Sequence, residues 1–562
     1  MLVPKLLTTL KGYTARQFRA DLQAGIIVGI VALPLSIAFA IASGLSPEKG
    51  LYTAIIAGFL ISALGGSRVQ IGGPTGAFVI IVFGIVQQYG LDGLIVATMM
   101  AGIALMILGF AKLGGIIKYI PFPVTSGFTA GIAVVIFSTQ VKDLLGLRIQ
   151  QVPAQFFGRW AAYLGHLGTT DLSTVAVALG SLIILVLWPR VSRKIPSPFV
   201  ALIAATLAVQ LLHLPVETIG TRFGVIDASL PRPILPHVNE AMIVSLVGPA
   251  FTIAMLAAIE SLLSAVVADG MIGSRHRSNM ELVAVGAANL IVPLFGGMPA
   301  TGAIARTATN IRNGGRTPIA GIVHALTLLL ITLFFGRLAA LIPLACLAAI
   351  LTVVAYHMSE WRTVRSEIRG ERSDAAVLLA TLTLTVVVDL TVAIAVGMVL
   401  AAILFMKRMA ETSTVEVISS TLRESYLEQG EAAASARHAR VPRDVEVYDI
   451  NGPFFFGAAE KFRDALAQMS RRPRALILTM ENVPVIDSTG LRVLTAVIQQ
   501  CRSAGTRVLM ADLTAETRAR IADSELGRML GPGELELTYD QALFSLGPTG
   551  EMATAELQSP QS

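Results

Sequence analysis

The sequence predicts an α-helical polytopic membrane protein with a small cytoplasmic α/β domain at its C-terminal end. Of 562 residues, 54% are hydrophobic and 14% are charged, whereas about 25% is usual in soluble proteins. Most of the chain must therefore lie in lipid, but the composition becomes that of a soluble protein after Arg408. Two similar Gly/Pro motifs, at residues 72–78 and 296–304, stand in the two halves of the hydrophobic part and indicate an internal repeat.

Apolar segments follow a short cytoplasmic N-terminus, residues 1–20. The apolar run after Asp21 is too long for a signal peptide and lacks a cleavage site. A span needs about 20 mostly apolar residues, so we expect about fourteen spans within a transmembrane domain at 21–408. They are 22–42, 51–66, 75–88, 93–112, 121–140, 172–188, 198–213, 243–268, 280–295, 301–312, 318–336, 339–357, 374–388 and 391–406.

Loop charges give the expected orientation. One set of connections, which includes the two longest, near 141–171 and 214–242, is poorer in charge than the other set. The positive-inside rule therefore places the other set of loops and both termini in the cytoplasm. The two halves then have seven spans each in opposite orientation, which is an inverted repeat. The predicted inside loops contain Arg68, Lys112, Lys118, Arg190, Arg193, Lys194, Arg275, Arg277, Arg312, Arg316, Arg362, Arg365, Arg369, Arg372, Lys407 and Arg408.

The two Gly/Pro motifs begin the short third and tenth spans. Each has a glycine pair, a proline and then Thr-Gly-Ala. Half-helices that start from opposite sides should meet with their N-termini near the bilayer midplane, where free N–H groups and positive dipole ends form an anion site. Gly76 and Gly302 would let a ligand approach the backbone. Ordinary helix-packing glycines are the alternative, which the duplication and matched placement disfavour.

Two ionisable residues fall inside predicted spans. A cation such as Arg306 needs a partner in the membrane; a substrate anion would supply it, and snorkelling or a carboxylate pair is the alternative. Glu260 has apolar neighbours on both sides, and burial favours the neutral carboxyl group. We therefore predict a proton carrier, with a structural Glu260–Arg306 pair as the alternative. Ser264 follows one turn later on the same helix face.

The C-terminal part predicts a linker at 409–443, an α/β domain at 444–548 and a disordered tail at 549–562. Expected strands are 445–450, 475–480 and 507–511, and expected helices are 458–469 and 487–502. Ser488 opens a helix, where N–H groups would hold a phosphate, although a simple N-cap is favoured on local grounds.

Cofactors and nucleic acid are not expected. Cys346 and Cys501 lie in different contexts, so the sequence predicts neither a disulfide nor a metal cluster. The net charge of +6 is explained by the cytoplasmic loops rather than by nucleic-acid binding.

The whole chain resembles the SulP family of anion transporters, related to the SLC26 exchangers, which have fourteen spans and a C-terminal STAS domain. The resemblance is carried by the runs 32–39, 67–75, 258–263 and 310–318. Within the family, the runs 259–263, 358–360 and 452–456 look most like the bacterial aerobic C4-dicarboxylate transporters, whose substrates include succinate, fumarate and aspartate. Many sulfate permeases share this pattern.

The resemblance implies a core-and-gate architecture, with the substrate between the third and tenth helix N-termini. Sodium-coupled bicarbonate members have Asp, Thr and Thr where this chain has Glu260, Ser264 and Ile304. Loss of the hydroxyl at 304 weakens a sodium site, which favours proton coupling through Glu260. The implied substrate-binding residues are Phe39, Thr75, Gly76, Ala77, Phe78, Ser264, Gly302, Ala303, Ile304 and Arg306.

The expected function is secondary active transport in a bacterial inner membrane: proton-coupled uptake of C4-dicarboxylates by an elevator mechanism. A sulfate or bicarbonate permease and an uncoupled anion channel or exchanger are the alternatives. An enzyme is not expected, because the C-terminal part shows neither a metal cluster nor a nucleophile with a base. The resemblance also implies a homodimer involving the STAS domain, and makes that domain a candidate for binding cytosolic regulatory proteins, with Ser488 at the phosphorylated position of related anti-sigma antagonists.

Overall fold

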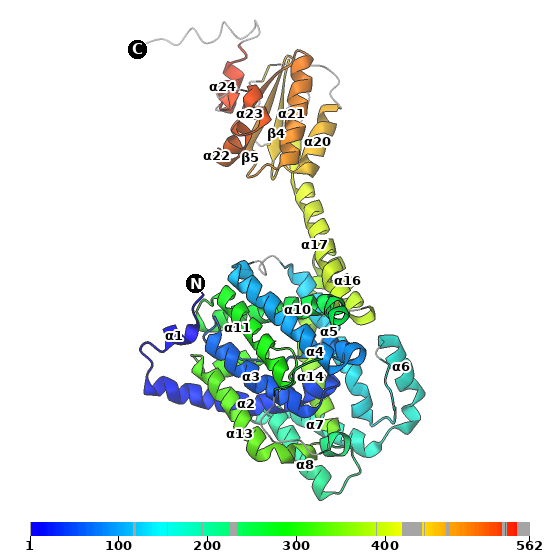
Figure 1. Cartoon of the computed structure of the whole chain (residues 1–562). Coiled ribbons are helices and arrows are strands. Elements are labelled where there is room, and N and C mark those ends of the chain that lie inside the picture. The colour runs from blue at the N-terminus through cyan, green and yellow to red at the C-terminus, as the bar shows by residue number, and fades with distance from the viewer. Residues whose placement is uncertain are drawn as a thin grey trace. The chain divides into compact units, whose positions relative to one another are not determined.

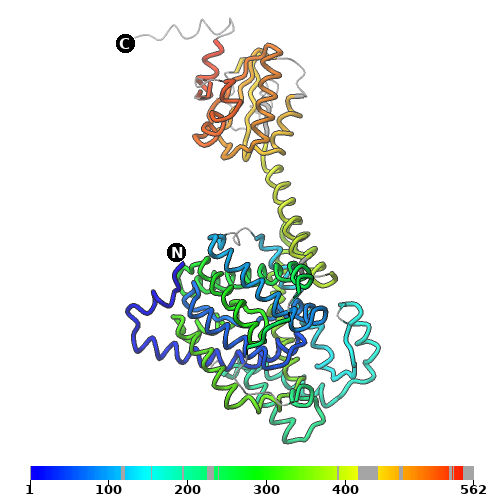
Figure 2. The backbone as a smooth tube through the Cα atoms, viewed as in Figure 1, coloured from blue at the N-terminus to red at the C-terminus, as the bar shows by residue number. Residues whose placement is uncertain are grey.

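The computed structural model describes residues 2–115, 120–153, 155–192, 195–224, 233–237, 239–388, 390–418, 441–442, 444–467, 473–530, 534–535 and 537–547. The chain forms two compact units, Met1–Ala401 and Ala402–Ser562. Figures 1 and 2 trace the path of the chain through both.

Every predicted span overlaps a helix. The third and fourth spans form one helix, α4, that is broken at Gly90, where φ is 68°. Nine helices within the described ranges are long and apolar enough to cross a membrane. The helices that match the spans are α2 (Ala15–Ala42), α3 (Pro47–Leu64), α4 (Val79–Phe110), α5 (Phe122–Leu145), α7 (Leu172–Val191), α8 (Ser197–Leu211), α10 (Glu240–Ile272), α11 (Ser278–Ile291), α12 (Ile304–Arg312), α13 (Ile319–Phe335), α14 (Leu344–Met358), α16 (Arg372–Val387) and α17 (Leu390–Thr412).

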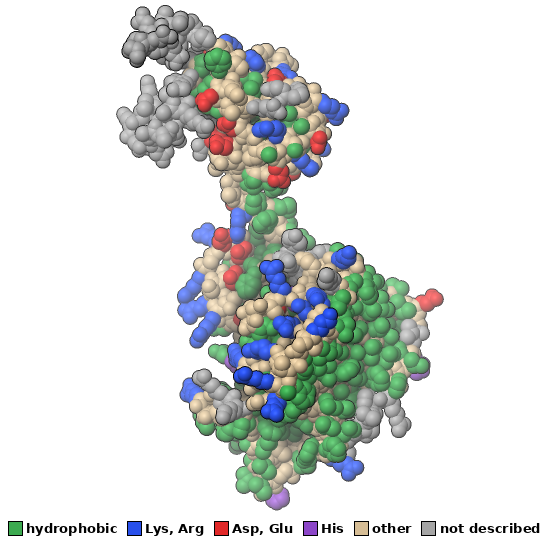
Figure 3. Space-filling model, turned by 90° about the vertical axis from the view of Figure 1, so that its left-hand side faces the viewer, with side chains coloured by type: hydrophobic (Ala, Val, Ile, Leu, Met, Phe, Trp, Pro, Cys, Tyr) green, Lys and Arg blue, Asp and Glu red, His purple; other side chains and the backbone are tan. Residues whose placement is uncertain are grey.

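The connections of the first unit carry four further helices, of which α6 lies at its periphery (Figure 1). They are α1 (Lys5–Thr9), α6 (Phe156–Gly165), α9 (Ile219–Phe223) and α15 (Trp361–Arg369). Much of the surface of this unit is hydrophobic, and Lys and Arg side chains gather in one region of the face seen in Figure 3. Exposed large apolar residues such as Ile107, Val186 and Phe334 form the kind of surface that requires lipid or a partner.

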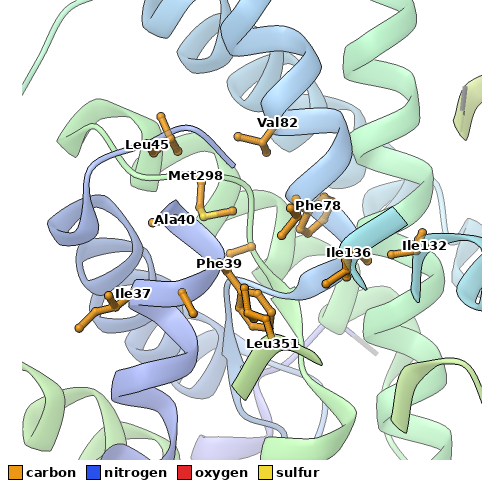
Figure 4. Close-up of a cluster of buried hydrophobic side chains, with 14 of the residues drawn as sticks. Ile37, Phe39, Ala40, Leu45, Phe78, Val82, Ile132, Ile136, Met298 and Leu351 are labelled. Carbon is orange, nitrogen blue, oxygen red and sulfur yellow. The ribbon is translucent and has the colours of Figure 1, made fainter. Parts of the chain in front are cut away.

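The helices of the first unit pack in two groups. The core group consists of α2, α3, α4, α10, α11, α12 and α13, whose members contact one another extensively. The gate group consists of α5, α7, α8, α14 and α16. The two groups meet along a seam where α2 lies against α14 and α5. A cluster of fully apolar side chains, including Phe78, Ile136 and Leu351, fills part of this seam (Figure 4).

The second unit is a four-stranded sheet with helices. The strands β3 (Thr414–Ile418), β4 (Val445–Asn451), β5 (Ala475–Asn482) and β6 (Arg507–Ala511) lie in the order 3-4-5-6. The β3–β4 pair is antiparallel and the other two pairs are parallel. The apolar side chains of β4 and β5 are buried with those of α20 (Phe456–Ala467) and α21 (Ser488–Ser503). Shorter helices follow: α22 (Ala515–Ala522), α23 (Glu525–Leu530) and α24 (Tyr539–Phe544).

The residues predicted as a linker, 409–443, begin with ordered structure. α17 continues to Thr412, and β3 follows at Thr414–Ile418. The five residues of β3 are rich in β-branched side chains, which suit a strand, but they are few and adjoin a charged segment. Residues 419–440 and the tail predicted at 549–562 lie outside the described residues.

Candidate anion-binding site

The two Gly/Pro motifs pair directly with each other. Strands β1 (Gly72–Gly73) and β2 (Thr301–Gly302) are antiparallel, with Gly72 opposite Gly302 and Gly73 opposite Thr301. Each strand leads at once into a helical segment: η1 (Gly76–Phe78) continues into α4, and α12 begins at Ile304. The prediction that the two helix N-termini meet is therefore confirmed by the pairing register.

Neither of these helix starts is capped by a side chain. Thr75 precedes η1 and Ala303 precedes α12, and no side-chain hydrogen bond caps either segment. The first N–H groups of a helix have no partner within the helix and need a side chain, water or a ligand. The two uncapped N-termini, beside the pair of strands β1 and β2, thus offer backbone donors and two positive dipole ends to an anion.

Glycine is required at the paired strands because side chains crowd them. Gly73 has φ +149°, and a Cβ atom there would lie 2.5 Å from Nη1 of Arg306. A Cβ atom at Gly302 would lie 1.9 Å from Nε2 of Gln70. A side chain at either position would therefore displace one of these two polar residues.

A cavity of about 400 Å³ opens beside the two helix starts. It lies on the seam between the groups: α2, α10 and α12 line it from the core group, and α5 and α14 line it from the gate group. Apolar side chains of Leu35, Leu263 and Val354 supply much of its wall. The predicted site residues that line it are Phe39, Thr75, Gly76, Glu260, Gly302, Ala303, Ile304 and Arg306.

Three predicted site residues do not line this cavity. Ala77 and Phe78 are fully buried in the apolar cluster of the seam, because the tight turn of η1 directs both side chains inward. Ser264 is also fully buried, and its hydroxyl donates to Oγ1 of Thr307 at 3.4 Å. The backbone N–H of Ala77 is still part of the helix start, whereas that of Phe78 donates to the carbonyl oxygen of Thr75 at 3.3 Å.

Arg306 is buried beside the cavity with one of its nitrogens unpaired. Its Nη2 donates to the carbonyl oxygen of Pro74, whereas Nη1 has no hydrogen-bond partner among the described residues. The side chain is only 3% exposed. Glu260 is near enough to interact electrostatically with this guanidinium, and an anion in the cavity would give Nη1 a direct hydrogen-bond partner.

Glu260 is bonded to Thr75 rather than to Arg306. Its Oε2 accepts a hydrogen bond of 2.8 Å from Oγ1 of Thr75, and the described ion pairs do not join it to Arg306. A hydroxyl group can donate to a carboxylate or accept from a protonated carboxyl. The Thr75 contact is therefore compatible with both protonation states of Glu260.

Glu281 is a second buried acid that sequence analysis missed. Its Oε2 accepts from the backbone N–H groups of Gly66 at 2.7 Å and Ser67 at 2.9 Å, and its Oε1 accepts from Nε2 of Gln70 at 2.8 Å. Gln70 also donates to Ser261 Oγ at 2.7 Å. Glu281 is thus held by three N–H donors and anchors the loop before β1, whereas Glu260 has the hydroxyl of Thr75 as its hydrogen-bond partner.

In the second unit, Ser488 is the exposed first residue of α21. The cap of this helix is Asp487, whose Oδ1 accepts from the N–H of Gly490 at 2.6 Å. No group of three or more His, Cys, Asp or Glu residues that could hold a metal ion occurs in the part of the chain that the structure describes.

Comparison with known families decides the classification. Residues 18–381 match the sulfate permease family, and residues 436–542 match the STAS domain. The chain belongs to the sulfate permease family. It is accordingly a multi-pass membrane protein and an anion transporter, and the second unit is its STAS domain.

Several bacterial relatives match nearly the whole chain, and two of them are at least 30% identical to it. The putative sulfate transporter YvdB of Bacillus subtilis is 41% identical over 524 residues, covering 93% of this chain and 96% of the relative. The bicarbonate transporter BicA of Picosynechococcus is 30% identical over 553 residues, covering 94% of each. These names contain sulfate and bicarbonate, and give no support to the predicted dicarboxylate branch.

Solved structures similar to this chain include a bacterial and a mammalian protein. The transmembrane domain of a cyanobacterial BicA has a TM-score of 0.63 at 31% identity, and covers 68% of this chain and 98% of that one. Murine Slc26a9 in the inward-facing state has a TM-score of 0.84 at 19% identity. The match covers 97% of this chain and 94% of that one. The second likeness shows the fold alone.

Proposed function

We propose that this protein is a secondary transporter that couples anion uptake to protons by an elevator motion of the core group along the gate group. The observation that carries the proposal is the cavity on the seam, where two uncapped helix N-termini, Arg306 and Glu260 meet. Backbone N–H groups of η1 and α12 would bind the anion's oxygens, and Nη1 of Arg306 would add a charge-assisted hydrogen bond.

The proton would be carried by Glu260. The ionised carboxylate takes up one proton and becomes neutral, so that it no longer repels an anion held beside Arg306. Thr75 connects the anion site with Glu260. Its backbone directly precedes η1, and its hydroxyl donates a hydrogen bond to Glu260. Binding of the anion and protonation of Glu260 therefore favour each other, which is the requirement for coupled transport.

The names of the relatives favour a small inorganic oxyanion, sulfate or bicarbonate, as the substrate. A C4-dicarboxylate is the second candidate, and one observation supports it: the cavity of about 400 Å³ has apolar walls that would fit a short carbon chain.

The remaining proposals follow from the loop charges and the family. We place the protein in a bacterial inner membrane, with both termini in the cytoplasm, as a homodimer. The exposed Ser488 would be a regulatory phosphorylation site at which cytosolic proteins act on the STAS domain. An uncoupled channel or exchanger is the competing function, in which Glu260 would have no proton to carry.

Uptake by the purified protein in liposomes tests the proposal. We expect labelled sulfate or bicarbonate to accumulate when the outside is more acidic than the inside, and to equilibrate without accumulation when the two pH values are equal. Labelled succinate should accumulate under the same gradient only if dicarboxylates are carried. Equal accumulation with and without the pH gradient would contradict proton coupling and would favour the uncoupled function.

A further inference from the structure

A second cavity lies at the opposite end of the same seam. It has a volume of about 140 Å³, which is room for a small anion with a few water molecules. Three helices contribute to both cavities. α5 lines the first with residues 122–129 and the second with residues 139–143, and α14 lines the first with residues 354–358 and the second with residues 344–351. The residues Thr129 and Thr139 are thus about 15 Å apart along α5. We call the second space the outer cavity.

An apolar layer separates the two cavities. Phe39 lines the first cavity and Leu351 lines the outer one, and both belong with Phe78 and Ile136 to the buried cluster shown in Figure 4. The outer cavity therefore lies on the transport seam, closed from the site beside Arg306 by a few side chains.

Cations surround the outer cavity. Among the described residues that line it, Lys142, Arg159 and Arg222 are basic and Asp143 is acidic. They come from the connections at 141–171 and 214–242, which by the proposed orientation lie outside. The positive-inside rule accounts for cations at the cytoplasmic face and not for these. The basic groups that line a cavity on the outer side therefore need an explanation other than membrane orientation.

The basic residues are held in different ways. Arg222 is fixed by two carboxylates, Asp143 at 2.7 Å and Glu217 at 2.6 Å. Lys142 instead donates from Nζ to the carbonyl oxygen of Ile149 at 2.8 Å. That oxygen is neutral, so the bond orients the ammonium group and leaves its charge available to an anion.

We propose that the outer cavity is a capture site for the transported oxyanion, in which Lys142 holds the anion before the apolar layer opens. Arg222 and its two carboxylates brace the wall, because α9 is joined to the start of α14 by the hydrogen bond from Ile219 N to the oxygen of Ile342 at 2.9 Å. The inference rests on the proposed function, and it adds a second oxyanion site on the other side of the apolar layer from Arg306.

Kinetics measured separately from the two faces test this proposal. We expect Lys142→Gln to raise the apparent KM for labelled sulfate or bicarbonate roughly tenfold for transport from the face of the outer cavity, the effect of losing one hydrogen bond to a charged group. The kcat from the same face and the KM from the opposite face should stay at wild-type values. The kcat from the opposite face should fall by the same factor, because the transport equilibrium fixes the ratio of kcat/KM in the two directions. Lys142→Arg should restore the KM, and Arg148→Gln, which removes an exposed charge from the same connection, should behave as wild type.

Three results would overturn the capture site. They are a KM for Lys142→Gln equal to that of Arg148→Gln, an equal change of KM from both faces, and a loss of kcat that Lys142→Arg does not restore. Wild-type protein that carries none of sulfate, bicarbonate or succinate would overturn the proposed function as well. The two failures are therefore distinguishable.

Discussion

Replacing Glu260 with glutamine is expected to abolish proton-driven accumulation of the anion. The carbonyl oxygen of a glutamine still accepts the hydrogen bond that Glu260 accepts from Thr75, so the local structure is kept. The amide is neutral at every pH and carries no proton across the membrane. Uptake under an inward proton gradient should therefore fall to the level of equilibration, while exchange of internal for external anion continues.

The matched control for this variant is Glu240→Gln. Glu240 is the exposed first residue of the same helix, α10, and its replacement should leave accumulation unchanged. The account of proton coupling fails if Glu260→Gln accumulates the anion against its gradient as the wild type does.

Replacing Ala303 with glutamate is expected to eliminate transport without unfolding the protein. Ala303 precedes α12, lines the cavity and is 7% exposed. A carboxylate there would bond the uncapped N–H groups of α12 and pair with Arg306, which is a favourable arrangement at a helix N-terminus. It would therefore occupy the place of the substrate anion.

Ala303→Gln separates charge from bulk, because glutamine has nearly the same size and no charge. We expect it to retain measurable uptake, with a thermal unfolding midpoint close to that of Ala303→Glu. Uptake in liposomes and the unfolding midpoint of the purified protein are the two measurements. Normal transport by Ala303→Glu, or an equal loss in both variants, would count against an anion at this position.

The sequence predicted the spans and the meeting of the two motifs because both depend on local patterns. Apolar length defines each helix, and Gly/Pro breaks at matching places define the half-helices. In the structure the two motifs pair as β1 and β2, with Gly72 opposite Gly302. This pairing follows once the two half-helices are placed with their N-termini together. Gly90 interrupts α4 between two predicted spans, which is also a local effect.

Side-chain directions at the site were less predictable. Ala77 and Phe78 follow Thr75 and Gly76 in sequence, yet η1 turns them into the apolar cluster and away from the cavity. Ser264 shares a helix face with Glu260 by spacing, but it bonds Thr307 of α12 instead. These outcomes depend on which helix packs against each face, and no spacing rule supplies that.

The anchor formed by Gln70 and Glu281 shows the same limit more strongly. The two residues are 211 positions apart in the chain, and Glu281 stands in the first turn of α11, where an acidic residue is common for reasons of helix polarity. Its burial, with three N–H donors, became visible only when the loop before β1 was placed beside α11.

Equilibrium binding of labelled sulfate or bicarbonate to purified Arg306→Gln tests most directly whether the anion lies between the paired helix starts. Loss of the charge-assisted hydrogen bond should weaken binding by roughly tenfold to a hundredfold. Arg312→Gln, which removes an exposed arginine from the end of the same helix, α12, should bind as the wild type does. Wild-type affinity in Arg306→Gln would contradict the proposed anion site.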